Sequence, residues 1–204
     1  EQRSSGTQNE FSEYSSERQR VIKPEFFAET GRIPTSRNTM TYLRYAEALN
    51  RAGYPQSAFL ILKHGMCYDN LVVYVDSVER VAAAELVDFD ANIFPKDHTF
   101  GIHSRGSGDS HINEYYTLPM PTDSLATRQD TIDYQIPLVE DMIIDEMALE
   151  GAFEGYRYYD LMRVALRRND ASYLAAPISR RNGEEDAALR AKLEDTSNWY
   201  LPLP

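Results

Sequence analysis

The sequence predicts a mostly α-helical protein whose short helices pair as hairpins and are separated by irregular segments. Residues 39–65 and 138–168 carry this prediction, because each shows apolar side chains at helical spacing on both sides of a glycine-containing turn. Between them, residues 90–136 hold several glycines and prolines and show no sustained periodicity. No convincing alternating strand pattern is present. We therefore expect tetratricopeptide-like helical hairpins with long irregular insertions.

The stretch TMTYLRYAEALNRAG, residues 39–53, predicts the first helix. One predicted face is apolar or small, and the opposite face is charged; the apolar face holds Tyr42, Tyr45, Ala46, Ala48, Leu49 and Ala52, and the charged face holds Arg44, Glu47 and Arg51. Gly53 suits the left-handed residue that ends a helix. Pro55 suits the first turn of the next helix, PQSAFLILKHG.

The rest of the chain predicts further helices. Residues 68–90 are expected to form one long helix, because apolar side chains recur there at Leu71, Val75, Val78, Ala82, Leu86 and Phe89, although LVVYV by itself also fits a strand. A second hairpin is expected at 138–153 and 156–168, and a short acidic helix at 184–195. The prolines predict an extended tail, NWYLPLP.

The bulk composition limits the organisation and the function. Residues 1–20 are polar and predict a poorly ordered stub, which leaves residues 21–204 as one helical domain. The net charge of −11 argues against nucleic acid and against an anionic membrane surface, and it is compatible with a neutral ligand such as a sugar or with a protein partner. The single cysteine excludes an internal disulfide and a cysteine-based zinc site. No metal or other cofactor is expected.

The predicted helix 138–153 carries two glutamates within its apolar arc. Glu146 and Glu150 share that arc with Leu138, Val139, Met142, Ile143, Leu149 and Phe153. Two carboxylates one turn apart could act in acid–base catalysis. We favour a structural interpretation, in which each carboxylate is paired with Arg44, Arg157 or Arg163, because an unpaired buried charge is costly. The nearby Tyr156, Tyr158 and Tyr159 fit either a core or a sugar-stacking role.

The segment FGIHSRGSGDSHINEYY, residues 100–116, is the other candidate site. His103, Ser104, Asp109 and His111 supply the members of a Ser-His-Asp set, but such partners usually converge from different elements. As a ligand-binding loop, this segment would use His103, Arg105 and Asp109 to bind sugar hydroxyls. Tyr115 and Tyr116 would stack on a sugar ring. The alternative interpretation is a polar surface loop without a ligand. A calcium loop starting at Asp88 is rejected, because Ile93 stands where glycine is required.

Two stretches together resemble the SusD/RagB family. They are YLRYAEALNRAG, residues 42–53, and DEMALEGAFEGYRYYDLMR, residues 145–163. The second contains the pattern Glu-Gly-x-Arg-x-x-Asp-Leu-x-Arg. The resemblance assigns a set of residues to the scaffold, namely Arg44, Glu47, Glu146, Glu150, Glu154, Gly155, Arg157, Asp160 and Arg163.

This resemblance implies a surface lipoprotein of the outer membrane that captures oligosaccharides or other nutrients and delivers them to a TonB-dependent, SusC-like transporter. Family members are longer, so it also implies an amino-terminal half, with the lipid anchor, that this chain lacks. No catalytic residue is implied. Two other functions stay open, namely a helical adaptor that binds only protein, and a glycosidase using Glu146, Glu150 or Glu154.

Overall fold

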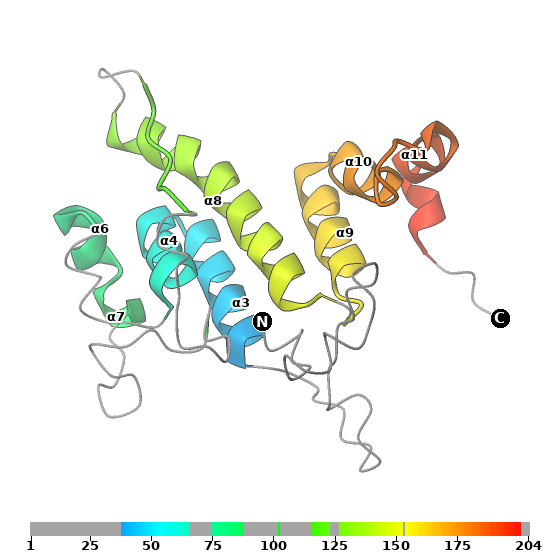
Figure 1. Cartoon of the computed structure of the whole chain (residues 1–204). Coiled ribbons are helices and arrows are strands. Elements are labelled where there is room, and N and C mark those ends of the chain that lie inside the picture. Colours follow the sequence, from blue (N-terminus) through cyan, green and yellow to red (C-terminus); the bar gives the residue numbers. More distant parts are fainter. Residues whose placement is uncertain are drawn as a thin grey trace, which may run out of the picture. The chain divides into compact units, whose positions relative to one another are not determined.

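The computed structural model describes residues 38–65, 75–87, 102, 116–122, 127–152 and 154–200. Every regular element within these ranges is helical, which confirms the predicted class (Figure 1). The chain forms two compact units, Glu1–Ile143 and Ile144–Pro204, and the border falls within helix α8, Arg128–Glu150. We call them the first and the second unit. The expected domain of residues 21–204 stays a prediction.

The predicted first hairpin is present as α3, Asn38–Arg51, packed against α4, Pro55–His64. Gly53 adopts a left-handed φ of 93°. The N–H of Tyr54 donates to the carbonyl of Leu49, and that of Gly53 donates to the carbonyl of Asn50. These two bonds form the Schellman ending of a helix, so the turn is built as the glycine predicted. Pro55 occupies the first turn of α4, also as predicted.

The buried face of α3 differs from the predicted one. Glu47 is 3% exposed, although it was placed on the charged outer side, and Ala48 is exposed, although it was placed on the apolar side. The buried line runs through Met40, Leu43, Ala46, Glu47, Leu49 and Asn50. The prediction was wrong here because it assigned every charged side chain to solvent. Residues of α4 are buried on nearly all sides, as expected for a central helix.

The prediction of a single long helix at 68–90 is wrong for residues 75–87, the part of that range that the structure describes. Two short helices stand there, α6, Ser77–Ala82, and α7, Ala84–Val87. Asp76 is extended and caps α6, which places the helix start well inside the predicted helix. The buried positions are Val75, Glu79, Ala83 and Val87, whereas the predicted apolar positions Val78, Ala82 and Leu86 are exposed.

Helix α8 starts ten residues before the predicted start at residue 138. Thr127 and Asp130 cap it reciprocally, because the Asp130 carboxylate accepts from the Thr127 N–H at 2.9 Å and the Thr127 hydroxyl accepts from the Asp130 N–H at 3.2 Å. The helix continues through Pro137 and ends at Glu150. The Thr-x-x-Asp pattern at residues 127–130 indicates the observed start of α8. The prediction used only the spacing of apolar side chains and therefore placed the start too late.

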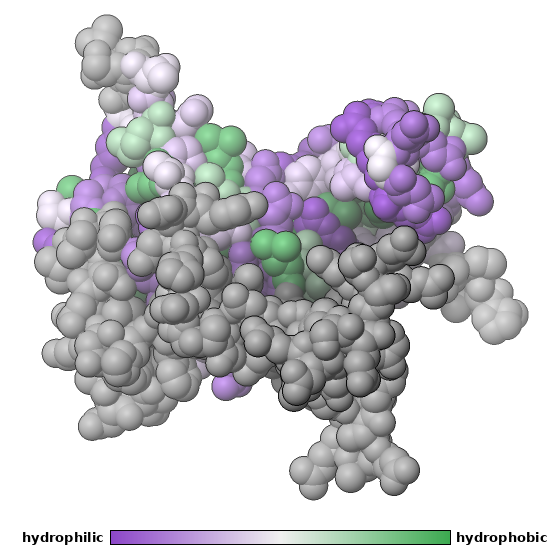
Figure 2. All heavy atoms as spheres, viewed as in Figure 1, coloured by the Kyte–Doolittle hydropathy of each residue, from purple (hydrophilic) through white to green (hydrophobic). Residues whose placement is uncertain are grey.

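The second unit contains α9, Arg157–Arg168, α10, Ser172–Ser179, α11, Ala187–Glu194, and the 3-10 helix η2, Thr196–Trp199. Helices α9 and α11 were predicted, whereas α10 was missed. Asn169 ends α9 with the same hydrogen-bond pattern that Gly53 gives α3, and its φ is 50°. The face of α10 and α11 seen in Figure 2 is mostly hydrophilic.

The tail was predicted to be extended, and this is wrong for Asn198 and Trp199, which belong to η2. The Trp199 indole N–H donates to the carbonyl of Leu193 at 2.6 Å, and the ring is 4% exposed. Burial of this ring therefore outweighs the preference for an extended chain. Tyr200 follows in an extended conformation, and residues 201–204 lie outside the described residues.

Candidate functional site

Most residues of the predicted ligand loop lie outside the described residues, namely His103, Arg105, Asp109 and Tyr115. Tyr116 is described and is 5% exposed, so in this structure its ring offers little surface to a ligand. The ligand-binding assignment stays a prediction for all five residues. What the structure does describe is how the two ends of this segment are attached to the first unit.

Two buried residues bracket the predicted loop. Ile102 is fully buried immediately before His103, and Tyr116 is buried immediately after Tyr115. The chain after Tyr116 is held by α8, because the buried Gln135 amide donates to the Pro119 carbonyl at 2.9 Å. The described residues on either side of the segment 103–115 are therefore buried within the first unit.

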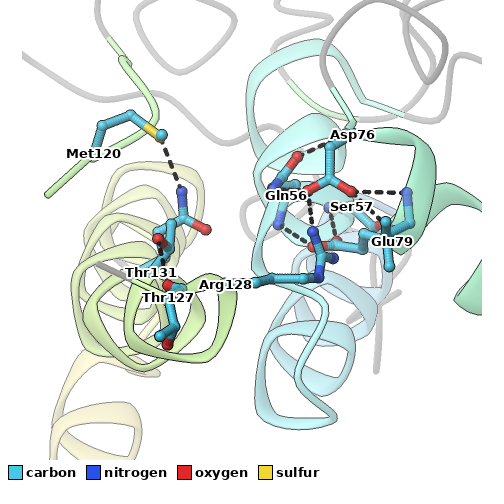
Figure 3. Close-up of polar contacts among 10 residues, drawn as sticks. Gln56, Ser57, Asp76, Glu79, Met120, Thr127, Arg128 and Thr131 are labelled. Atoms are coloured by element: carbon cyan, nitrogen blue, oxygen red, sulfur yellow. Dashed lines mark hydrogen bonds and ion pairs between the residues drawn. The ribbon is translucent and has the colours of Figure 1, made fainter. Parts of the chain in front are cut away.

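A polar junction joins α4, α6 and α8 in the first unit; we define it as Gln56, Ser57, Asp76, Glu79 and Arg128 (Figure 3). Helix α4 has Tyr54 at its N-cap position, and this side chain makes no capping hydrogen bond. The Glu79 carboxylate of α6 replaces it, accepting from the Ser57 N–H at 2.7 Å and from the Gln56 N–H at 3.4 Å. A residue distant in sequence therefore caps the central helix of this unit.

Asp76 is the second carboxylate of the junction. It accepts from the N–H groups of Val78 and Glu79, both at 2.9 Å, and so caps α6. It also accepts from the Gln56 side-chain amide at 2.6 Å and forms an ion pair with Arg128 at 2.5 Å. Asp76 thereby connects α6 to α4 and to the first turn of α8, as the dashed lines in Figure 3 show.

The two carboxylates of the junction have pKa shifts in opposite directions. Burial raises the pKa of Glu79 above its ordinary 4.5, only partly offset by the N–H groups of Ser57 and Gln56. Burial also raises the pKa of Asp76, but hydrogen bonds from Glu79, Arg128 and Gln56 outweigh it and hold the pKa below the ordinary 3.8. This junction was not predicted, although Asp-x-x-Glu at 76–79 is a recognisable helix-start pattern in the sequence.

The lowered pKa of Asp76 predicts a pH-dependent contribution to stability. Above pH 3.8 both the folded and the unfolded chain carry the charge, and the folded-state contacts stabilise the protein. As pH falls from 3.8 through the lower folded pKa, this contribution is lost. We expect Asp76→Asn, which keeps a capping oxygen, to be less stable than wild type at neutral pH and to approach it at acid pH. Urea unfolding at a series of pH values measures this difference, and a constant difference would contradict the prediction.

A second polar group links α3 to α8, again within the first unit. Arg51 contacts the Glu140 carboxylate at 3.1 Å and also pairs with Glu47. The two carboxylates are nearly inaccessible, with 2% and 4% of their side chains exposed, whereas Arg51 is 36% exposed. Arg44 contacts Glu47 at a longer 3.7 Å. Glu140 was not predicted to be a buried carboxylate.

The buried glutamates of the resemblance motif are placed as expected. Glu146 and Glu150 are 1% and 5% exposed, and neither is without an interaction partner. The carboxylate that the Arg157 guanidinium contacts is that of Asp145, at 3.0 Å, and the same side chain also donates to the Ile144 carbonyl at 2.8 Å. The expected pairing of Arg157 with a buried glutamate is therefore replaced by a bond to the α8 backbone.

The rest of the motif forms the turn and the first part of α9. Glu154 precedes Gly155, which has a left-handed φ of 81°. Helix α8 ends earlier, at Glu150, so Gly155 belongs to the turn that leads into α9. Asp160 is 1% exposed and accepts from Arg163 at 3.1 Å, and Arg163 also contacts the Met147 sulfur at 3.7 Å. Pairing of Arg163 or Arg44 with Glu146 or Glu150 stays a prediction.

The described residues contain no group of three or more His, Cys, Asp or Glu side chains that could hold a metal ion. They also contain no helix long and apolar enough to cross a membrane.

The helices of the two units, and the buried carboxylates that link α3 to α8 and α6 to α4, define a helical-scaffold protein. A model of the SusD family matches residues 28–204, so the chain belongs to the SusD family. This is a family of non-catalytic proteins that bind nutrients and glycans at the cell surface together with a TonB-dependent transporter. No curated protein and no solved structure matches the chain.

Proposed function

We propose that this protein binds an oligosaccharide or another small nutrient at the cell surface and delivers it to a SusC-like, TonB-dependent transporter. The observation that carries the proposal is the family match over residues 28–204. The acidic net charge of −11 supports a neutral ligand over an anionic one. Attachment to the outer membrane through a lipid anchor is part of the same proposal.

We place the ligand contacts in the segment 103–115 and at Tyr116. His103, Arg105 and Asp109 would bind sugar hydroxyls, and Tyr115 and Tyr116 would provide the aromatic contacts. The buried Ile102 before this segment, and the Gln135 amide that holds the Pro119 carbonyl after it, support this placement, because a segment with held ends loses less conformational entropy on binding. Tyr116 would need to turn outward to stack.

The buried carboxylates support a binding function over a glycosidase. Glycoside hydrolysis requires carboxylates that reach the substrate, whereas Glu146 and Glu150 are almost fully buried and have partners within the protein. We therefore assign Glu146 and Glu150 to the scaffold. Substrate turnover by the wild-type protein that is lost on Glu150→Gln with unchanged melting would contradict this assignment.

Isothermal titration against a panel of neutral oligosaccharides tests the proposed function. We expect one or more sugars to bind, and we expect Arg105→Ala and Asp109→Ala to weaken binding without changing the melting temperature. Glu184→Ala, which removes an exposed carboxylate of the second unit, is the matched control and should leave binding unchanged. If no sugar or peptide binds, the alternative is a helical adaptor that binds only protein.

A further inference from the structure

The second unit carries two exposed aromatic rings on different elements. Tyr159 of α9 is 61% exposed, and Tyr200, directly after η2, is 62% exposed. The ring of Tyr158, the residue before Tyr159, meets that of Tyr159 edge to face, with centroids 5.7 Å apart and planes at 88°. The Tyr158 hydroxyl reaches the carbonyl of Trp199, the residue before Tyr200, at 2.9 Å. Burial raises the pKa of Tyr158, and the phenols of Tyr159 and Tyr200 raise it further. We call Tyr158, Tyr159 and Tyr200 the tyrosine patch.

The patch is held by hydrogen bonds and burial. The Tyr158 hydroxyl donates to the Trp199 carbonyl at 2.9 Å, which ties α9 to the end of η2. Trp199 is fixed by burial and by its bond to the Leu193 carbonyl. Tyr200 follows in an extended conformation and is 62% exposed, although the neighbouring Trp199 is buried. The backbone around the rings is therefore held in place before a ligand binds, which reduces the entropy lost on binding.

The two exposed tyrosines also keep hydrogen-bonding capacity. Neither the Tyr159 nor the Tyr200 hydroxyl makes a hydrogen bond to another residue in the part of the chain that the structure describes. A tyrosine combines a π face, which attracts polarised C–H groups, with a hydroxyl at the ring edge that both donates and accepts. A sugar ring presents the complementary pattern, with C–H groups on its face and hydroxyls around its rim.

We propose that the tyrosine patch is an oligosaccharide contact site of the second unit, in which a neutral pyranose stacks on Tyr159 or Tyr200. The net charge of −11 favours a neutral sugar over an acidic one. This site uses the ligand class of the proposed function, but it is separate from the loop residues assigned above. Its role is to hold a sugar unit of an extended chain, and it performs no chemistry.

The test uses the full chain with tyrosine rings labelled for NMR. Neutral hexasaccharides of glucose (α- and β-linked), xylose and mannose are titrated, and the ring signals of Tyr159 and Tyr200 are followed. We expect at least one sugar to shift these signals, and we expect Tyr159→Ala and Tyr200→Ala each to weaken binding about three- to tenfold, the size of one aromatic contact. Tyr159→Phe keeps the ring and should lose less. Tyr134→Ala, at a tyrosine of α8 in the first unit that is 44% exposed, is the control.

The outcomes separate this site from the loop. If a sugar binds, and its affinity falls on Arg105→Ala but is unchanged by Tyr159→Ala and Tyr200→Ala, the tyrosine patch is overturned and the proposed function stands. If the tyrosine variants weaken binding and the loop variants do not, the patch is supported and the loop assignment fails. If none of the four sugars shifts the ring signals, the patch proposal is overturned.

Discussion

Glu79→Ala should lower the free energy of unfolding of the first unit by about 2–3 kcal/mol. The variant removes the carboxylate that caps α4 and leaves the buried Ser57 N–H, now bonded at 2.7 Å, without its acceptor. Loss of this buried acceptor leaves a buried donor unsatisfied, which destabilises the folded state. Urea unfolding followed by circular dichroism measures the change.

Two further variants identify the cause. Glu79→Gln keeps an oxygen for the Ser57 N–H and removes the charge that burial disfavours, so we expect it to cost less than about 1 kcal/mol. Glu85→Ala removes an exposed glutamate of the neighbouring α7 and should be nearly neutral. If Glu79→Ala is as stable as Glu85→Ala, the capping role is wrong. If Glu79→Gln lowers the free energy of unfolding as much as Glu79→Ala, the charge of Glu79 contributes more to stability than its hydrogen bond to Ser57.

Arg51→Met should destabilise the first unit by about 2–4 kcal/mol. Its guanidinium contacts Glu47 on the same helix and Glu140 on α8, and both carboxylates are almost fully buried. Methionine retains much of the side-chain volume, so the effect reports on the lost cation more than on a cavity. The same unfolding measurement applies, together with hydrogen exchange of the α3 and α8 amides.

The neighbouring Arg44 provides the control. Arg44→Met removes a contact to Glu47 that is longer, at 3.7 Å, and more exposed, so it should cost well under 1 kcal/mol. Adding Glu140→Gln to Arg51→Met should recover part of the stability, because it removes one of the buried charges. Equal effects of Arg51→Met and Arg44→Met would show that the link between α3 and α8 does not depend on this cation.

The predictions that the structure confirmed rest on neighbours in sequence. Gly53 and Pro55 stand within one turn and specify where α3 ends and α4 begins. Helix α9 was predicted within one residue of its observed start, because its apolar side chains recur regularly. The family resemblance rested on the same kind of contiguous pattern, and the family match over residues 28–204 confirms it.

The wrong predictions concern residues whose burial depends on contacts with residues distant in the sequence. Glu47 and Glu79 look like surface residues in a helical pattern, but both are buried. Glu47 pairs with Arg51 of its own helix, which also contacts Glu140 of α8, and Glu79 accepts from the Ser57 N–H of α4. The prediction of one long helix at 68–90 was wrong for a local reason as well, because it did not take Asp76 as the cap at which α6 begins. For the candidate ligand site, the sequence indicated the loop residues, and the described residues add the anchoring positions Ile102 and Tyr116.

By itself, the sequence determined the helical class, the hairpin turn at Gly53 and the family. The class and the turn depend on residues within a few positions of one another, and the family depends on two contiguous motifs. Only the tertiary structure decided which carboxylates are buried and what they bind. The Glu79 carboxylate reaches the Ser57 N–H across 22 positions, and Arg51 reaches Glu140 across 89. The electrostatic cost of burying a charge depends on its partner in space, and the spacing of residues along a helix does not specify that partner.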